Sequence, residues 1–265
     1  MKRRVLGVRI LVCIKQVPNQ DAKYAINADN NGIIYDDNTA YWINMYDEHA
    51  IEAALQIKES IANSSIDILS IGPKRVESAI RRSLEMGADY GYRLVYEGEV
   101  TLSPSIKSQM IAEFCEGREY DLIITGVMSE DMMSGQVGPM LAARLDIPSA
   151  TAVMQFIINT ENNSIWLERE LDGGLRGSLE LKLPVLITVQ SGINRPRYPS
   201  FSNVMRAKKS EIIEVATSTH LHNLQYERLV DIPEPEVGRQ GIKLTGSLSE
   251  KAQALWELLH GKSLI

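Results

Sequence analysis

Cysteines and long apolar runs are scarce in this chain, and both absences narrow the class of protein. Cys13 and Cys115 are the only cysteines among 265 residues, too few for a disulfide framework or a cysteine-built zinc site. No stretch approaches the roughly 18 consecutive apolar residues that a membrane-spanning helix needs. We therefore expect a reduced, cytoplasmic protein that does not insert directly into a membrane.

The chain also lacks an excess of positive charge. It has 28 lysines and arginines against 34 aspartates and glutamates, for a formal net charge of -6. Proteins that bind nucleic acid normally present a clustered basic surface, so nucleic acid is not an expected partner. What the chain does have is 44% hydrophobic residues, enough to bury one substantial core.

Apolar strands alternate with segments of helical length through the first half of the chain. Strands are predicted over 9–14, 66–71, 92–96 and 121–125, with helices over 44–62, 75–86, 105–115 and 140–145. Such alternation needs crossover connections and therefore a parallel sheet, in which ligands bind at the carboxyl ends of the strands. The fold class is α/β, with a doubly wound, mostly parallel sheet.

The first helix has a recognisable start. Asn44 is predicted to cap it through its side chain, with Asp47 as a capping-box-like partner. Its apolar residues, among them Ala50, Ile51 and Leu55, fall on one stripe, so we expect the other face to be solvated.

The loop after the fourth strand is the most distinctive segment. It follows Leu122–Ile124, contains Gly126, Gly135 and Gly138, and runs into a helix. A loop of small residues before a helix N-terminus gathers unpaired backbone amides, which suits a phosphate. The pattern is neither Walker A nor GxGxxG, so it indicates a nucleotide without naming one, and an ordinary strand-to-helix connection is the alternative.

Beyond residue 152 the pattern changes to strands over 153–158, 165–171, 174–181 and 185–189, a β extension that completes the sheet. Next comes a proline-bracketed irregular segment, which should expose Tyr198 and Phe201. The polar stretch from 207 has too little apolar content for its own core, so we expect this arm to lie on a partner.

Several motifs occur together in this order. They are Lys15-Gln16-Val17-Pro18, Asn44-Met45-Tyr46-Asp47-Glu48, Gln136-Val137-Gly138-Pro139, Arg169-Glu170-Leu171-Asp172-Gly173-Gly174 and Arg197-Tyr198-Pro199-Ser200. With them the chain closely resembles the β subunit of electron-transfer flavoproteins (the ETF β or FixA-like family) over about residues 9–210.

This resemblance implies an adenine-nucleotide α-hydrolase-like (Rossmann-like) fold and an electron carrier instead of an enzyme. It implies a heterodimer whose ETF α subunit carries the redox-active FAD at the subunit interface. Electrons would arrive from an acyl-CoA dehydrogenase and leave to a membrane ETF:quinone oxidoreductase. The cofactor does the redox chemistry, and the polypeptide sets its position and potential.

The resemblance also implies an AMP site in this subunit. Its residues would be Cys13, Asn44, Met45, Tyr46, Asp47, Ile71, Gly126, Val127, Met128, Ser129, Glu130, Asp131, Met132, Met133, Ser134, Gly135, Gln136 and Val137. Main-chain groups near Cys13 and Ile71 would meet the adenine, while Ser134, Gln136 and the amides of Gly135 and Val137 would face the phosphate.

One departure concerns the nucleotide itself. In flavin-bifurcating relatives the loop resembles Asp-Gly-Asp-Thr-Ala-Gln-Val-Gly-Pro, and the pocket holds a second FAD. Here Met132 and Met133 replace a glycine and a carboxylate, and their bulk favours AMP over a second FAD.

By the same resemblance, Arg197, Tyr198, Pro199, Ser200 and Phe201 match the loop that grips dehydrogenases, with Phe201 as its apolar anchor; internal packing of Phe201 is the alternative. We expect a nucleotide-binding core over 1–193, a partner-recognition loop over 194–206 and an arm with a final helix over 207–265 that packs on the α subunit.

Two other classes share a sheet of this kind. A universal-stress-type nucleotide-binding signalling protein would not need the β extension, the aromatic loop or the arm. An ATP-pyrophosphatase would need a Ser-Gly-Gly phosphate loop where this chain has Lys15-Gln16-Val17-Pro18, so we disfavour it.

Overall fold

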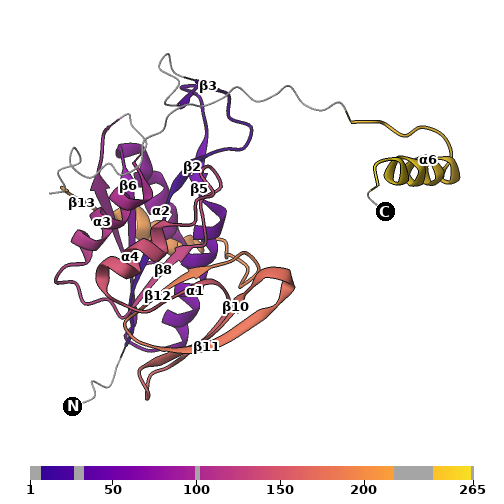
Figure 1. The fold of residues 1–265 in the computed structure, drawn as a ribbon. Coiled ribbons are helices and arrows are strands. Elements are labelled where there is room, and N and C mark those ends of the chain that lie inside the picture. Colours follow the sequence, from indigo (N-terminus) through magenta and orange to yellow (C-terminus); the bar gives the residue numbers. More distant parts are fainter. Residues whose placement is uncertain (1–6, 27–32, 99–101, 218–240, 264–265) are drawn as a thin grey trace. The chain divides into compact units, whose positions relative to one another are not determined.

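A nine-stranded sheet forms the centre of the larger of two units of the chain (Figure 1). The computed structural model describes residues 7–26, 33–98, 102–217 and 241–263. In spatial order the strands are β11 (Arg176–Lys182), β10 (Ser164–Glu170), β9 (Ser149–Asn159), β12 (Val185–Val189), β8 (Leu122–Gly126), β1 (Arg9–Cys13), β6 (Ser65–Gly72), β7 (Tyr90–Val95) and β13 (Ile212–Val215). In this spatial order every pair of neighbours between β9 and the edge strand β13 is parallel. At the other edge, β10 pairs antiparallel with β9, and β11 pairs antiparallel with β10. The predicted doubly wound, mostly parallel α/β sheet is confirmed.

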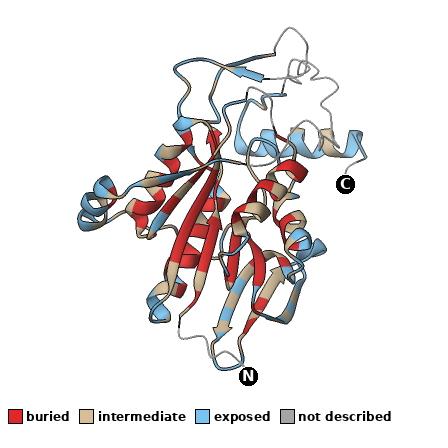
Figure 2. Ribbon diagram, turned by 90° about the vertical axis from the view of Figure 1, so that its left-hand side faces the viewer, coloured by how far each residue is buried: buried red, intermediate tan, exposed pale blue. Residues whose placement is uncertain are grey.

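Helices cover both faces of this sheet, and a separate hydrophobic core lies under each layer. One core contains residues of α1 (Met45–Ser60), α2 (Glu77–Met86) and α5 (Phe201–Lys209). The other contains residues of α3 (Pro104–Cys115) and α4 (Val137–Leu145). Along β1, Ile10 and Val12 enter the first core and Leu11 the second, as the alternation of side chains along a strand requires. Figure 2 shows the buried residues concentrated in the central strands of the sheet, whereas the edge strand β11 has only exposed and intermediate residues.

The prediction that α1 has one solvated face holds with one exception: Met45, Gln56, Glu59 and Ser60 are exposed, but Glu52 on the same face is buried. The buried residues of α1 are Asp47, Ala50, Ile51, Glu52, Ala53, Ala54, Leu55 and Ile57. The helix lies over β1, β6, β8 and β12 and is also contacted by the segment near Arg197. Glu52 is therefore buried on the outer face by its ion pair with Arg197.

Two small antiparallel pairs lie beside the main sheet. β2 (Gln16–Pro18) pairs with β5 (Tyr41–Ile43), and β3 (Tyr24–Ile26) pairs with β4 (Ile33–Tyr35). Residues 27–32, between β3 and β4, lie outside the described residues. Short 3₁₀ turns, η1 (Lys74–Val76) and η2 (Asp172–Gly174), complete the connections.

Residues 200–215 are more regular than the sequence indicates. Phe201, expected in an irregular loop, is the first residue of α5, and Ser200 caps this helix by accepting a hydrogen bond from the Asn203 amide at 3.3 Å. Shortly after α5, β13 pairs with β7 at the sheet edge. The polar stretch 218–240 lies outside the described residues.

The chain divides into two compact units, Met1–Val230 and Asp231–Ile265. The second unit contains α6 (Leu248–Gly261), which begins with a capping box formed by Ser247 and Glu250. Within α6, Leu248, Leu255 and Trp256 are exposed. Among the described residues, no helix has the length and apolar character required to cross a membrane.

Candidate nucleotide site

The carboxyl ends of three parallel strands lie side by side. β1 is hydrogen-bonded to β6 on one side and to β8 on the other, with Cys13 in register with Leu69 and Thr125. The carboxyl ends of the three strands therefore bring Cys13, Ile71 and Gly126 to one edge of the sheet. The side chains of Cys13 and Ile71 pack against the second core, so these two residues would meet a ligand through main-chain groups.

Asp47 fastens two of these strand ends to the first turn of α1. Its side chain is buried and accepts hydrogen bonds from the Lys15 amide at 2.7 Å and the Gly126 amide at 3.0 Å. Burial raises the pKa of Asp47 to about 7, although the two backbone donors act to lower it. The carboxyl group thus sets the spacing between β1, β8 and the helix.

Asn44 does not cap α1 with its side chain, and this prediction is wrong. Its Nδ2 instead donates to the Met128 carbonyl at 2.9 Å, and its Oδ1 accepts from the Glu130 amide at 3.0 Å. The Glu130 carboxylate in turn accepts from the Met45 amide at 3.0 Å, next to the positive end of the helix. Asn44 therefore holds the loop, and a carboxylate of that loop caps the helix in its place.

Lys15 is a residue of this site that the sequence analysis missed. Its ammonium donates to both oxygens of Asp131 at 2.6 Å and to Ser129 Oγ at 3.3 Å. Burial acts to raise the pKa of Asp131, but Lys15 outweighs burial and lowers it. One feature of the sequence could have indicated this role: Lys15 is the first residue after the predicted strand, which ends at Ile14.

The strand-end loop, residues 127–136, passes close to α1 because Gly126 has no side chain. A Cβ at this position would lie 2.5 Å from Asp47 Oδ1 and 2.6 Å from Tyr46 Cβ. At the far end of the loop, Gly135 has φ of +63°, a conformation that favours glycine.

The donors at the end of this loop suit a phosphate. No side chain caps α4 at Gln136, so the first backbone amides of this helix are available to a ligand. Met132 and Met133 are both more than half exposed. The side chains of these two methionines are therefore largely in contact with solvent and do not fill the space inside the loop.

The expected recognition loop shows an inward and an outward side. Tyr198 and Phe201 are 89% and 82% exposed. The Arg197 side chain instead faces α1, where its guanidinium binds Glu52 and Glu59. The sequence analysis missed both glutamates, because nothing near Arg197 in the chain indicates them.

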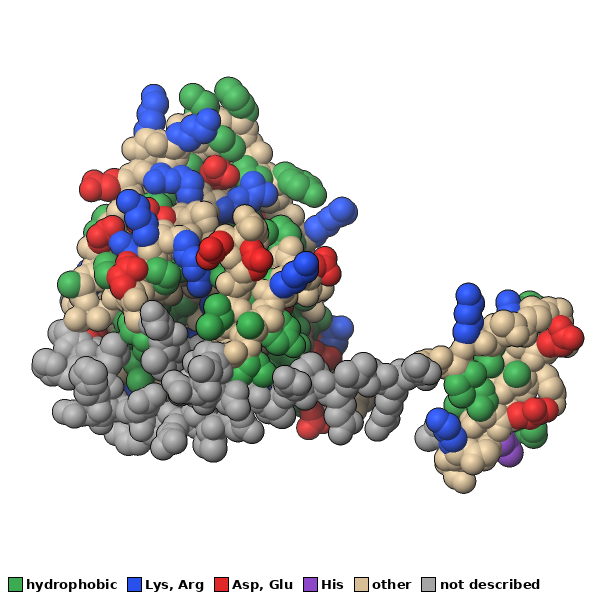
Figure 3. Space-filling view, turned by 90° about the horizontal axis from the view of Figure 1, so that it is seen from above, with side chains coloured by type: hydrophobic (Ala, Val, Ile, Leu, Met, Phe, Trp, Pro, Cys, Tyr) green, Lys and Arg blue, Asp and Glu red, His purple; other side chains and the backbone are tan. Residues whose placement is uncertain are grey.

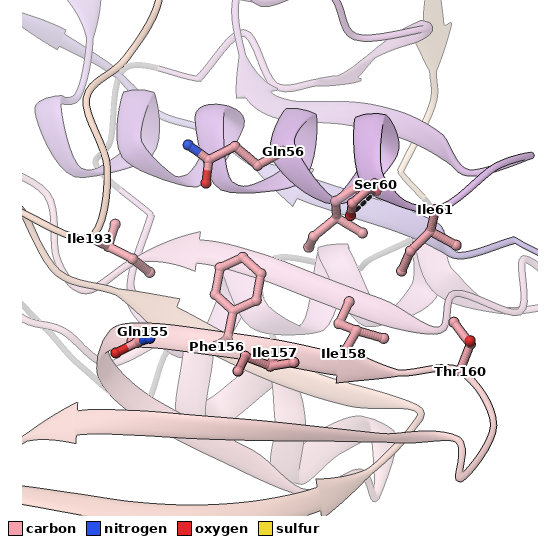
Figure 4. A pocket seen from close by; sticks show the side chains of 10 residues that line it. Gln56, Ser60, Ile61, Gln155, Phe156, Ile157, Ile158, Thr160 and Ile193 are labelled. Carbon is pink, nitrogen blue, oxygen red and sulfur yellow. Dashed lines mark hydrogen bonds between the residues drawn. The ribbon is translucent and has the colours of Figure 1, made fainter.

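A second concave surface lies between α1 and β9 (Figure 4). This groove has a volume of about 570 Å³. Its lining residues are Gln56, Ile57, Ser60, Ile61, Gln155, Phe156, Ile157, Ile158, Thr160 and Ile193. None of these is charged, so the groove offers no group for acid, base or metal chemistry.

The surface seen from above carries both signs of charge. Over the α/β unit, lysine and arginine side chains are interspersed with aspartate and glutamate side chains (Figure 3).

Comparison with known proteins identifies the family. A model described as "Electron transfer flavoprotein domain" matches residues 32–220. The chain belongs to the electron transfer flavoprotein family. Among its relatives named "Electron transfer flavoprotein subunit beta", that of Dictyostelium discoideum is 31% identical over 261 residues, 98% of this chain and 100% of the relative. That of Bacillus subtilis is 31% identical over 267 residues, covering 97% and 100%, and that of Homo sapiens is 34% identical over 207 residues, covering 77% and 80%.

Within this electron transfer flavoprotein chain, most of the expected site residues lie in one neighbourhood. Asn44, Met45 and Asp47 contact the strand-end loop or the strand end before it. Arg197 to Phe201 form a separate segment that contacts α1 farther along the helix.

Proposed function

We propose that this chain is the β subunit of a heterodimeric electron-transfer flavoprotein and holds AMP as a structural cofactor. The observation that carries the nucleotide site is the junction of β1, β8 and α1. There Asp47 ties the strand ends together, and Gly126 leaves no room for a side chain. Such a junction holds main-chain groups in a fixed arrangement. This arrangement suits a ligand that stays bound without reacting.

The phosphate is expected at the start of α4, and not at the start of α1. The Glu130 carboxylate already occupies the Met45 amide, whereas α4 has no side-chain cap. Ser134 and the amides of Gly135 and Val137 would therefore hold the phosphate, with the adenine against main-chain groups near Cys13 and Ile71. Lys15 adds a positive charge beside the loop.

The proposed partners account for the exposed apolar side chains. A helix of 14 residues is marginal on its own, and Leu248, Leu255 and Trp256 of α6 are exposed. We assign α6 to contact with the α subunit, whose FAD would supply the redox chemistry. Tyr198 and Phe201 would dock an acyl-CoA dehydrogenase, and a membrane quinone oxidoreductase would accept the electrons.

Co-expression with the α subunit tests this proposal. The account predicts a yellow heterodimer in the cytoplasm whose flavin is reduced by an acyl-CoA dehydrogenase and its substrate. A colourless homo-oligomer that binds nucleotide without a partner would contradict it and would favour the universal-stress-type alternative.

One observation favours a second candidate, a flavin-bifurcating β subunit with FAD in place of AMP. Met132 and Met133 are exposed and so leave space beside the loop for a larger ligand. Two FAD molecules for each heterodimer would support this candidate.

A further inference from the structure

A set of hydrogen bonds fixes Arg197 on α1 in both its backbone and its side chain. The Arg197 amide and Nε donate to Glu52 Oε2 at 3.2 and 2.8 Å, and Nη2 donates to Glu52 Oε1 at 2.9 Å. The Glu52 side chain is 5% exposed. A guanidinium that binds a carboxylate through two nitrogens has a defined orientation, so the backbone that leads into Tyr198 is defined as well.

A second contact fixes the same segment one helical turn earlier. Asn194 Nδ2 donates to the His49 carbonyl at 2.9 Å, and Asn194 Oδ1 lies 3.0 Å from His49 Nδ1. Since His49 and Glu52 are three residues apart, they lie on the same side of the helix. Residues 194–197 therefore run along α1 with polar contacts at both ends.

The helix that follows this segment, α5, is fixed to α2 and to the residues directly after α2. Arg206 Nη2 donates to the carbonyls of Leu84 and Ala88, each at 2.9 Å, and Arg81 binds the carbonyls of Ala207 and Ser210. The backbone between these attachments carries Tyr198 and Phe201 outward, both more than four-fifths exposed.

From this arrangement we propose that Glu52 is a positioning residue: through Arg197 it holds Tyr198 and Phe201 in the geometry in which they dock an electron-transfer partner with an apolar pocket. The inference rests on the proposed function, in that Phe201 is taken as the docking side chain. Holding an aromatic side chain and its backbone in the bound geometry reduces the ordering cost of association. A buried ion pair is weak support for stability alone, whereas an arginine next to a docking side chain supplies orientation.

The exposed Glu59 offers a matched control. It binds the same guanidinium from the same helix, but its side chain is 61% exposed. Water can replace an exposed carboxylate at little cost. Glu52→Gln and Glu59→Gln therefore make the same chemical change on one arginine, at a buried and at an exposed contact.

The experiment uses the αβ complex and measures the KM and kcat for an acyl-CoA dehydrogenase as the electron donor, with hydrogen exchange at the amides of residues 197–201. Glu52→Gln should raise the KM about tenfold, because the docking segment must then be ordered on binding, leave kcat unchanged and speed exchange. Glu59→Gln should change the KM less than about twofold. If Glu52→Gln does not fold, Arg197→Lys should give the same KM change, because lysine keeps the charge but cannot bind the carboxylate through two nitrogens.

Unchanged KM and unchanged exchange in Glu52→Gln would overturn the inference, and so would equal effects of the two glutamine variants. Failure of the proposed docking is distinguishable from this result, because Phe201→Ala would then leave the KM unaltered while exchange in Glu52→Gln still increased.

Discussion

Two segments of this protein are fastened to α1, and they differ in which groups they leave facing outward. The strand-end loop 127–136 is tied to the start of the helix by Asn44, whose side chain bonds to two backbone groups of the loop. The proposed docking segment, residues 194–201, is tied along the flank of the helix by Arg197, which bonds to carboxylates. The first arrangement leaves main-chain amides outward, and the second leaves aromatic rings.

This difference teaches that one helix can serve two kinds of recognition. Main-chain amides suit a small anionic ligand, whereas exposed aromatic side chains suit a pocket on a macromolecule. The attachments do not overlap along α1, since one involves Asn44 and Asp47 and the other His49, Glu52 and Glu59. A substitution at one end should therefore impair one function and spare the other.

Asn44→Ala should give the largest effect. The change leaves the Glu130 amide and the Met128 carbonyl without their partner, at about 1–3 kcal/mol for each buried group. We expect the free energy of unfolding to fall by about 3 kcal/mol and nucleotide to be lost, with little change in dehydrogenase docking. Urea unfolding and nucleotide extraction measure both.

Asn38→Ala is the control for that variant, because within the described part of the chain the Asn38 side chain bonds only to Asp36, in an exposed turn. It should cost less than about 0.5 kcal/mol. Equal destabilisation by the two alanine variants would contradict the role given to Asn44.

Gly126→Ala tests the close approach of the loop to α1. The added methyl group would meet Asp47 Oδ1 and Tyr46, and overpacking of this kind costs about 2 kcal/mol. Nucleotide content should fall with stability. Gly117→Ala is the control, since its Cβ would meet nothing within 4 Å and its φ of +72° alone costs about 1 kcal/mol. A Gly126→Ala protein as stable as the parent would show that α1 and the loop are not in tight contact.

Phe201→Ala probes the other segment. An aromatic at the centre of an interface is worth about 2 kcal/mol, so dehydrogenase affinity should fall by that amount, while flavin content and the urea midpoint stay unchanged. Titration of the αβ complex with a dehydrogenase measures the affinity. Equal affinities and equal flavin reduction rates for variant and parent would remove Phe201 from the docking surface.

The pH dependence of folding stability should come from Asp47, at the junction of β1, β8 and α1. Burial raises the pKa of Asp47 to about 7 from an ordinary 3.8, so between these values the folded protein holds a proton that the unfolded chain releases. The contribution of Asp47 to stability is therefore fully present below about pH 4 and is lost as the pH rises through 7.

The slope from this one proton is at most about 1.4 kcal/mol per pH unit. Asp47→Asn should lack it, and urea unfolding at several pH values measures the difference. Dehydrogenase docking should not share this dependence, because residues 194–197 contact α1 at His49, Glu52 and Glu59 and not at Asp47. Parallel stability profiles for parent and Asp47→Asn would contradict the assignment.

Local sequence patterns were enough to predict the alternating strands and helices, the parallel pairing of the strands and the carboxyl ends of the strands as the place for a ligand. Buried strands are recognisable as short apolar runs, and helices between consecutive strands indicate that the strands pair in parallel. A local pattern also gave the wrong role to Asn44. Its cap position is apparent from its neighbours, but its actual partners lie 84 and 86 residues away.

The contacts of the docking segment could not be predicted in the same way. Arg197 and Glu52 are 145 residues apart, and no periodicity links them. The helix that begins at Phe201 did have a local signal, since Ser200 is a favoured N-cap residue, but the prolines before it indicated an irregular segment. β13 has four residues and lies at a sheet edge, where pairing decides strand formation more than composition does.

The most direct test of the central claim is the nucleotide content of the purified αβ complex, measured by flavin absorbance and by extraction after denaturation. The account predicts one FAD and one AMP for each heterodimer, with AMP lost in Asn44→Ala and retained in Phe201→Ala. Two FAD molecules would contradict the assignment of AMP, and a single FAD with no second nucleotide would contradict the nucleotide site itself.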